Sequence, residues 1–306
     1  MRSEVSIVIV SYNVADLLRA CLRSIADQNV PAEIIVVDNA STDNSVEMVR
    51  NEFSLVHLIA NKENRGFSAA NNQGIDASSS PLILLLNPDT EMEPFGLRKL
   101  IDFAKSNPAT SLVGPQLLNS DDSVQPSAWK RPSPWDLILE SLFLHKLFRV
   151  SDYDSSQFDS QFEPGMLSGA ALLFSRELYL RIGGLDSNLF WMEDADFAYR
   201  ARKAGGKVIY YPAVKIVHHS GQSSKKNLSV VLSNQLLSKL KYYRKHSGWL
   251  PAFIAGWFCL FHIFTRILIF GALSVIGKRF AARAAGYLGA LPRFFSYVFT
   301  NNQKVT

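Results

Sequence analysis

Cysteine is almost absent from this 306-residue chain, and the two that occur, Cys21 and Cys259, lie far apart in apolar surroundings. This argues against a disulfide framework and a cysteine-rich metal site, and it favours a reducing, cytosolic setting. The first apolar run, residues 5–10, is too short for a signal peptide, and we expect none. A content of 47% hydrophobic and 19% charged residues is typical of a folded chain.

Acidic residues are missing from the last part of the chain. The last acid is Asp196, and residues 226–306 hold 11 lysines and arginines. The other 21 basic residues share residues 1–225 with all 27 acids, so an acidic body is followed by a basic, apolar tail. This pattern predicts contact with an anionic membrane surface. We expect no nucleic-acid partner, because no zinc-finger or RNP-type motif occurs.

Neither of the common glycine-rich phosphate loops is present, although the chain has the pattern of a nucleotide-binding fold. Strand-like apolar runs alternate with helical patterns up to residue 106, which predicts an α/β fold with a mostly parallel sheet and helices on both faces. In such a sheet the loops that follow the strands meet at one edge. A phosphate group must then be held in another way, most simply through a metal ion.

The most informative stretch is Pro-Leu-Ile-Leu-Leu-Leu-Asn-Pro-Asp-Thr at residues 81–90. Five apolar residues without alternation predict a strand that is buried on both faces, and Pro88 ends it. Asp89 then lies at the carboxyl end of a central strand, at the same edge as Asp38 after the second strand. A carboxylate there can bind Mg²⁺ or Mn²⁺, whereas the stretch taken alone is also explained by a plain Pro-Asp turn.

Two further clusters carry chemistry later in the chain. Three acids fall within residues 193–196, directly after Phe-Trp-Met. We interpret the three large apolar residues as a buried segment that leads to the acids. A carboxylate in such surroundings has a raised pKa and can act as a base. Surface charge at a helix start is the alternative. His218 and His219 end a strand-like run, and beside two acidic motifs a metal-binding role is favoured over a structural one.

The region between these clusters has a weaker pattern. Residues 135–148 are predicted to form a helix with one apolar face, which either lines an acceptor cleft or simply packs. Residues 150–163 are rich in Asp, Ser and Gln and are predicted to form a mobile loop.

Seven motifs that occur in order resemble those of the GT-A fold glycosyltransferases of family 2, in particular the rhamnosyltransferase-like bacterial enzymes that build cell-surface polysaccharide. They are Val-Ser-Tyr-Asn (10–13), Val-Val-Asp-Asn-Ala-Ser-Thr-Asp (36–43), Asn-Arg-Gly-Phe (64–67), Leu-Asn-Pro-Asp (86–89), Ser-Gly-Ala (168–170), Glu-Asp-Ala-Asp (193–196) and Val-His-His (217–219). The resemblance covers roughly residues 3–222. It implies an inverting, metal-dependent transfer of a sugar from a nucleotide-diphosphate sugar to a hydroxyl group.

The resemblance also implies a nucleotide pocket. In that pocket Asp38 would hydrogen-bond the pyrimidine base above a floor formed by Ser11 and Tyr12. Arg65 would approach the diphosphate or the base.

The metal site and the base follow from the same resemblance. Asn87 and Asp89 stand where the family has its Asp-x-Asp metal motif, and the first acid is here an asparagine, which leaves Asp89 as the main ligand of Mg²⁺ or Mn²⁺. His218, or else His219, would complete this site. Asp194 matches the general base that deprotonates the acceptor hydroxyl group.

The substrates can be narrowed further on the same basis. The Gln-x-x-Arg-Trp motif of processive synthases is missing, so we expect transfer of one sugar at a time. Our first choice of donor is dTDP-rhamnose, with a UDP-sugar as the alternative, and the expected acceptor is a polyprenyl-linked saccharide. The alternative functions are a nucleotidyltransferase and a catalytically silent GT-A module. Asn87 in place of the first acid would allow the second of these.

We predict two domains, a glycosyltransferase domain at residues 1–225 and a helical membrane-association region at 226–306. Residues 249–277 are strongly apolar but contain His262 and Arg266 near their middle, and a central arginine is costly in a membrane span. We therefore predict helices that lie in the membrane interface on the cytoplasmic face. A single span in 249–277 and a homodimeric helix pair are the alternatives. The side chains expected on lipid phosphates are those of Lys278, Arg279, Arg283 and Arg293.

Overall fold

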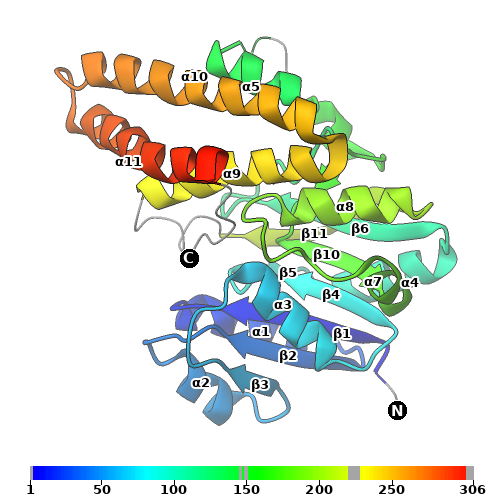
Figure 1. The fold of residues 1–306 in the computed structure, drawn as a ribbon. Helices are drawn as coiled ribbons and strands as arrows, with labels where there is room; N and C mark the ends of the chain where they lie inside the picture. Colours follow the sequence, from blue (N-terminus) through cyan, green and yellow to red (C-terminus); the bar gives the residue numbers. More distant parts are fainter. Residues whose placement is uncertain (1–2, 145–146, 148–150, 220–227, 301–306) are drawn as a thin grey trace. The chain divides into compact units, whose positions relative to one another are not determined.

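The computed structural model describes residues 3–144, 147, 151–219 and 228–300 of the protein (Figure 1). The chain forms two compact units. The first contains Met1–Arg131, Asp152–Ser187 and Glu193–Ser223, and the second contains Pro132–Ser151, Asn188–Met192 and Ser224–Thr306. The predicted division into functional domains at residues 225 and 226 stays a prediction.

The first unit is built on a mixed, nine-stranded sheet with the strand order β3-β2-β1-β4-β10-β6-β11-β5, to which β7 adds by pairing with β6. The strands β3, β2, β1 and β4 are parallel to one another, as the alternating pattern predicts. β10 lies antiparallel between β4 and β6, which the sequence did not indicate. The bounds of the strands are β1 Val5–Ser11, β2 Ala32–Asp38, β3 His57–Ala60, β4 Leu82–Leu86, β5 Thr90–Met92, β6 Thr110–Leu118, β7 Val124–Gln125, β10 Ala171–Ser175 and β11 Lys207–His218, with β8 Ala128–Trp129 and β9 Met166–Leu167 forming a separate pair.

Helices cover both faces of this sheet, and the strand residues alternate between two apolar cores. Leu84 packs in the core that is shared with α1 and α4, while its neighbour Leu85 packs in the core that is shared with α3 and α8. This double burial explains why β4 has no polar residue to mark an exposed face. The helices are α1 Ala15–Ala26, α2 Ser45–Glu52, α3 Phe67–Asp76, α4 Gly96–Ser106, α7 Arg176–Ile182 and α8 Glu193–Lys203.

The predicted mobile loop at residues 150–163 contains a 3-10 helix, Ser155–Asp159. Phe158 is buried, and its ring packs on Tyr210 of β11 at a centroid distance of 5.3 Å. Phe162 packs on the same ring at 5.1 Å. The interpretation from polar composition is wrong for this part, because two aromatic side chains anchor an otherwise polar segment.

The second unit consists of α5 Pro134–Ser141, α9 Leu228–Ser247, α10 Trp249–Leu273 and α11 Lys278–Thr300. The last three helices run side by side (Figure 1). α5 ends at Ser141, earlier than the predicted helix at 135–148, of which residues 145, 146 and 148 lie outside the described part of the chain. Its N-terminus is held by a capping box, in which Ser133 accepts from the backbone and Asp136 accepts from the N–H of Ser133.

Arg266 of α10 is buried inside this unit. Its guanidinium donates hydrogen bonds to the carbonyl oxygens of Glu140 at 2.5 Å and Ser141 at 3.3 Å, and it lies over the ring of Phe143 at 3.3 Å. The buried arginine therefore has partners from the end of α5 and does not point outward from α10. The expected cost of Arg266 in lipid is thus not an argument against a membrane span.

The exposed face of α10 is apolar. Cys259, His262 and Arg266 share the buried face, and large apolar side chains recur on the other side. By length and composition this helix is able to cross a bilayer. The aromatic residues on the exposed face are Trp249, Phe253, Trp257, Phe261 and Phe264.

The packing of β4 makes a direct prediction about stability. Leu84→Ala should lower the free energy of unfolding by about 2–5 kcal/mol, because Leu84 is fully buried and the cavity left in a two-sided core cannot collapse. Leu55→Ala is the matched control, since Leu55 is 97% exposed, and its effect should stay within about 0.5 kcal/mol. Urea unfolding of both variants checks this, and equal midpoints would contradict the two-sided burial.

Candidate active site at the sheet edge

Two buried polar side chains end the first two strands. Ser11 and Asp38 are paired in the register of β1 and β2, and both are almost fully buried. One carboxylate oxygen of Asp38 accepts from the backbone N–H of Ser41 at 2.9 Å. Among the described residues, the other carboxylate oxygen and the Ser11 hydroxyl have no hydrogen-bond partner. Because an unpaired buried polar atom costs about 1–3 kcal/mol, these two atoms suit a polar ligand.

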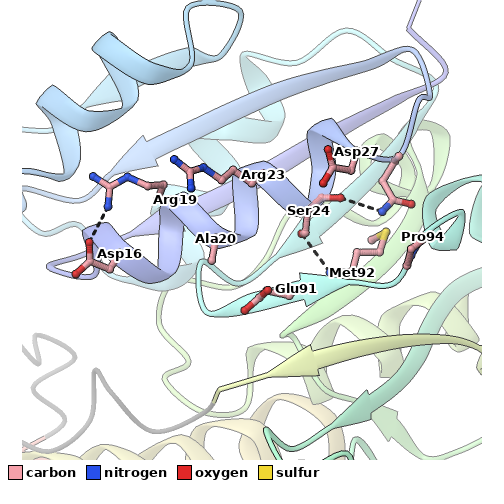
Figure 2. Close-up of a pocket in the computed structure, with 10 residues that line it drawn as sticks. Asp16, Arg19, Ala20, Arg23, Ser24, Asp27, Glu91, Met92 and Pro94 are labelled. Atoms are coloured by element: carbon pink, nitrogen blue, oxygen red, sulfur yellow. Dashed lines mark hydrogen bonds and ion pairs between the residues drawn. The ribbon is translucent and has the colours of Figure 1, made fainter.

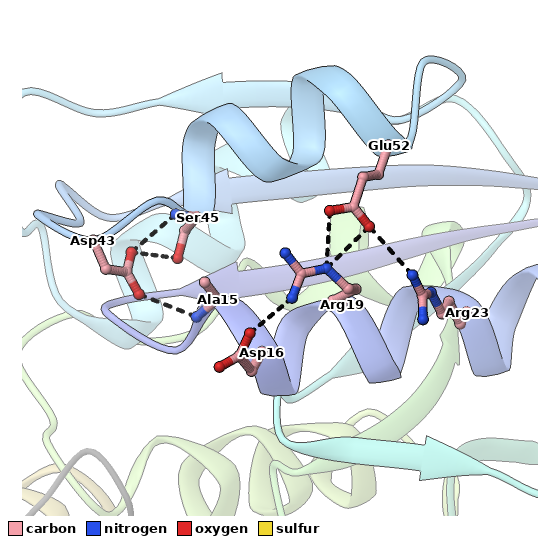
Figure 3. Close-up of polar contacts among 7 residues, drawn as sticks. All are labelled: Ala15, Asp16, Arg19, Arg23, Asp43, Ser45 and Glu52. Atoms are coloured by element: carbon pink, nitrogen blue, oxygen red, sulfur yellow. Dashed lines mark hydrogen bonds and ion pairs between the residues drawn. The ribbon is translucent and has the colours of Figure 1, made fainter.

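The loops that follow β1 and β2 are tied together beside these residues. Asn13 has a left-handed backbone with φ of +56°, a conformation that asparagine tolerates, and its N–H donates to the Ser41 hydroxyl at 2.9 Å. Asp43 accepts from the N–H groups of Ala15, which begins α1, and Ser45, which begins α2 (Figure 3). Burial alone would raise the pKa of Asp43, but the hydrogen bonds from Ser45 and Ala15 outweigh it and lower this pKa.

Tyr12 lies between Ser11 and Asn13 in the sequence and is 42% exposed. Its ring is therefore available at the surface of the edge, next to the buried Ser11. Ser11 and Tyr12, the predicted floor of the nucleotide pocket, thus differ in exposure. Ser11 has a buried hydroxyl group, and Tyr12 has an exposed aromatic ring.

A network of side-chain amides fixes the backbone at Arg65. The Asn39 amide group donates to the Asn64 side chain at 2.8 Å, and its oxygen accepts from the Arg65 N–H at 3.0 Å. Gly66 follows with φ of +80°, which favours glycine, and begins the turn into α3. The Arg65 side chain is exposed. Asn39 directly follows Asp38, so the network holds Arg65 close to the end of β2.

The end of β4 places Asn87 and Asp89. The Asn87 N–H donates to the carbonyl oxygen of Ala170 at 2.9 Å, which extends the pairing of β4 with β10. Asp89 is 8% exposed, and its backbone oxygen accepts from the His219 N–H at 2.9 Å. The antiparallel pairing of β5 with β11 brings the His218 Nε2 to 3.4 Å from the Asp89 Oδ1.

The two histidines have different surroundings. Both ring nitrogens of His219 are engaged, Nε2 with Glu91 at 2.7 Å and Nδ1 with the Ser120 hydroxyl at 2.8 Å. The ring of His218 uses Nδ1 for Gln125, at 2.7 Å, and turns Nε2 toward Asp89. This geometry favours His218 over His219 as the partner of Asp89. The ligand role itself stays a prediction.

The donor set can be tested against a divalent metal ion. In the described part of the chain, no three His, Cys, Asp or Glu side chains gather into a complete metal site. Asp89, in the turn directly before β5, and His218, at the end of β11, supply two donors, an oxygen and a nitrogen. Mg²⁺ in phosphate-transfer sites is held by one or two protein side chains plus the phosphates of the substrate. The residues present therefore fit a metal ion that binds together with a diphosphate.

Asp194 lies at the start of α8 and is partly buried. Its carboxylate accepts from the N–H of Gly169 at 3.3 Å and from that of Ala195 at 2.7 Å. Burial raises the pKa of Asp194 from 3.8 to about 6. Gly169 is followed by Ala170, whose carbonyl oxygen accepts from Asn87, so a short chain of contacts connects Asp194 with the end of β4.

The burial of residues 190–192, which precede the acidic cluster at Asp194, differs from the prediction. Phe190 and Trp191 are 43% and 46% exposed, and of the three residues before the acidic cluster only Met192 is buried. The raised pKa of Asp194 therefore does not come from a buried Phe-Trp pair. Asp196 is fully buried and pairs with Arg200 at 2.8 Å, which makes it a structural residue of α8.

A groove of about 370 Å³ lies between α1 and β5 (Figure 2). None of the predicted site residues lines it. Its two arginines, Arg19 and Arg23, are paired with Glu52 (Figure 3), and Glu91 is bonded to His219. Both arginines and Glu91 of the groove are therefore already engaged with other side chains, and the candidate site lies at the sheet edge instead.

Comparison with known proteins decides the family. Residues 6–177 match the family model described as Glycosyl transferase family 2. The chain belongs to this family. This confirms the predicted family and, with it, the prediction that the protein is a glycosyltransferase.

Curated relatives of this glycosyltransferase carry related names. An N-acetylglucosaminyl-diphospho-decaprenol L-rhamnosyltransferase of Mycobacterium tuberculosis is 28% identical over 270 residues, which cover 81% of this chain and 87% of that protein. A poly(ribitol-phosphate) beta-glucosyltransferase of Bacillus spizizenii is 26% identical over 223 residues, or 68% of this chain and 34% of that protein.

A solved structure resembles this glycosyltransferase in fold. It is a mannosyltransferase from Pyrobaculum calidifontis in complex with GDP-Man and Mn²⁺, with a TM-score of 0.59 and 18% sequence identity, and the match covers 99% of this chain and 89% of that one. The GT-A fold that was predicted from the motifs is confirmed.

The raised pKa of Asp194 predicts a pH-dependent stability effect. The folded state must carry this carboxylate without full hydration above pH 6, whereas the unfolded state ionises it near its ordinary pKa of 3.8. The cost therefore grows from pH 3.8 to about pH 6 and then stays constant. Asp194→Asn removes this cost. The substitution should therefore raise the free energy of unfolding by roughly 1–3 kcal/mol more at pH 7.5 than at pH 4.5. Urea unfolding at both pH values measures this, and an effect independent of pH would refute the raised pKa.

Proposed function

We propose that this glycosyltransferase transfers a single sugar, with inversion, from a nucleotide-diphosphate sugar to a hydroxyl group of a polyprenyl-linked saccharide. The name of the mycobacterial relative speaks of an L-rhamnosyl group and a diphospho-decaprenol acceptor, and that relative aligns with most of this chain. This supports dTDP-rhamnose as the donor, with a UDP-sugar as the alternative. The product then belongs to the synthesis of a cell-surface polysaccharide.

The observation that carries the proposal is the arrangement at the end of β4. Asp89 faces His218 across the β5–β11 pair, and Asn87 is linked through the 169–170 backbone to Asp194. A pair of metal donors and a carboxylate with a pKa of about 6 thus lie on strands and loops that are hydrogen-bonded to one another. Sugar transfer needs both, a group to stabilise the leaving diphosphate and a base for the acceptor.

Each predicted residue has a role in this mechanism. Asp38 and Ser11 present their unpaired oxygens to the base and ribose of the donor, beside the open ring of Tyr12. The exposed guanidinium of Arg65 neutralises charge on the diphosphate. A divalent ion held by Asp89 and His218, with Asn87 next to it, would offset the charge that develops on the leaving group.

Asp194 acts on the acceptor. Its carboxylate accepts the proton of the acceptor hydroxyl group while that oxygen attacks the anomeric carbon from the side opposite to the leaving diphosphate. Two backbone N–H groups hold the carboxylate in position, and a pKa of about 6 keeps it ionised at neutral pH but basic enough to take a proton.

The nucleotide and the metal are tested by thermal shift. The purified protein is heated in detergent with dTDP, UDP, GDP or CDP, each with and without Mn²⁺ or Mg²⁺. A ligand that binds only the folded state raises the melting temperature, so one diphosphate should stabilise the protein, and it should do so much more strongly with the metal ion. Stabilisation that does not depend on the metal would remove the metal from the proposal.

Asp194 makes the sharpest test of the mechanism. Asp194→Asn should lower kcat by about 10²–10⁴-fold, because the base is lost, while the nucleotide-induced thermal shift should stay as in the wild type. In the wild type, kcat/KM should fall about tenfold for each pH unit below 6, since the protonated carboxyl cannot accept a proton. Tyr179→Phe is the control for folding, because it removes a hydroxyl group that donates to Asp76 and belongs to none of the predicted site residues. If Asp194→Asn transferred the sugar as fast as the wild type, Asp194 would not be the base.

We propose further that residues 226–306 hold the enzyme on the anionic, cytoplasmic surface of the membrane, where a polyprenyl-linked acceptor resides. The exposed face of α10 is apolar over its whole length, and acids are missing from this part of the chain. Lys278, Arg279, Arg283 and Arg293 lie on the neighbouring helix α11 and match anionic lipid phosphates.

The packing of α10 favours a position in the plane of the interface over a membrane span. Phe270 of α10 stacks with Phe280 and Tyr287 of α11, and the guanidinium of Arg283 lies over the Phe270 ring at 5.6 Å. A transmembrane α10 would bring this cationic helix into the hydrocarbon region, which is costly. An in-plane α10 inserts only its aromatic face and leaves the cations at the level of the headgroups.

This surface can be tested with vesicles. The double variant Trp257→Asp/Phe264→Asp should weaken binding to vesicles of phosphatidylglycerol and phosphatidylcholine about tenfold or more, because two exposed aromatic side chains no longer enter the interface. Leu55→Asp/Leu180→Asp is the matched control, since Leu55 and Leu180 are exposed apolar side chains of the first unit and are more open than Trp257 and Phe264. Sedimentation with vesicles gives the affinities. Equal loss in both double variants would show that α10 has no special role.

A further inference from the structure

The hairpin formed by the end of β6 and β7 contacts His218 through Gln125 of β7. The Gln125 Oε1 lies 2.7 Å from the Nδ1 of His218. The Gln125 Nε2 lies 3.3 Å from the backbone carbonyl oxygen of His218 and 2.8 Å from the Asn119 Oδ1. A backbone carbonyl only accepts hydrogen bonds, so the nitrogen of the Gln125 amide must be on that side.

The second contact supports the same orientation. The Asn119 amide nitrogen donates to the Ser123 hydroxyl at 2.9 Å, and this hydroxyl donates to Asp121 at 2.5 Å. The oxygen of Asn119 is therefore the atom that faces Gln125, and it needs a donor there. The His218 carbonyl oxygen and the Asn119 Oδ1 are both acceptors, which leaves the Gln125 oxygen to face the His218 ring.

An amide oxygen accepts only, so the Nδ1 of His218 must carry a proton. In a neutral imidazole the other nitrogen then has a free lone pair, and this atom, Nε2, lies 3.4 Å from the Asp89 Oδ1. A histidine that binds a metal through one nitrogen usually donates from the other to an oxygen that fixes its ring. The hairpin supplies this oxygen.

We propose that Gln125 is a positioning residue that holds His218 as the Nδ1–H tautomer, with Nε2 ready to bind the metal ion beside Asp89. This rests on the proposed metal-dependent function. It adds the 119–125 hairpin to the site, a region for which the motifs of the sequence assigned no role. Gln125 acts through His218 and touches neither the donor nor the acceptor in this assignment.

The first experiment reads the tautomer without any metal. Long-range ¹H–¹⁵N NMR of histidine-labelled protein distinguishes a protonated Nδ1 from a protonated Nε2, and His218→Gln identifies the signals of His218. The wild type should show the Nδ1–H form. Gln125→Met, which has a similar shape but makes no such hydrogen bonds, should shift His218 toward the Nε2–H form. An Nε2–H tautomer in the wild type overturns the proposal.

The second experiment measures the affinity for Mn²⁺ with the nucleoside diphosphate that gives the largest thermal shift. Gln125→Met should weaken Mn²⁺ binding about 10–100-fold. Gln125→Glu keeps an acceptor for Nδ1 but loses both donated bonds, so it should retain most of the affinity. Ser120→Ala is the matched control in the same hairpin, because Ser120 contacts His219 and not His218, and it should bind Mn²⁺ like the wild type.

The outcomes separate this proposal from the proposed function. If the wild type binds Mn²⁺ and Gln125→Met binds it equally well, Gln125 has no positioning role and the metal-dependent function stands. If the wild type does not bind Mn²⁺ with any nucleotide, the metal-dependent function fails, and the tautomer spectra still decide whether Gln125 fixes the ring of His218.

Discussion

The end of β4 is held from both sides at the point where the chain leaves the core. Burial on both faces fixes the strand, and β1 and β10 pair with its two edges, so the backbone at Asn87 has little freedom. The chain then turns into β5, whose pairing with β11 sets Asp89 beside His218. The candidate metal site thus depends on hydrophobic packing some residues earlier, because the burial and pairing of β4 set where the chain leaves the core toward Asp89.

The sequence was sufficient to predict the parallel half of the sheet. Residues 5–11, 32–38 and 82–86 are apolar runs bounded by turn residues, and their helices have a clear period, so local pattern and tertiary burial agree. The antiparallel strand β10 could not be predicted, because its run of Ala, Leu and Phe is equally compatible with either direction. Direction is set by the partner strand, which a single sequence does not identify.

The candidate site was predictable as far as residue types and loop positions allow. Motifs named Asp38, Asp89 and Asp194, but Gln125, the amide that contacts His218 beside Asp89, lies in none of these motifs. The environment of Asp194 was misjudged for a related reason. Phe190 and Trp191 suggested burial by proximity along the chain, while the carboxylate is bonded to Gly169, which is 25 residues away in sequence.

The proposed base, Asp194, has to meet two opposing demands. A carboxylate with an ordinary pKa would be a weak base at neutral pH, and burial that raises its pKa also destabilises the folded protein above that pKa. The two backbone hydrogen bonds to Asp194 act against the shift and keep it moderate, at about 6. Further burial without these bonds would give a stronger base that is protonated at neutral pH, so the observed environment is a compromise between basicity and ionisation.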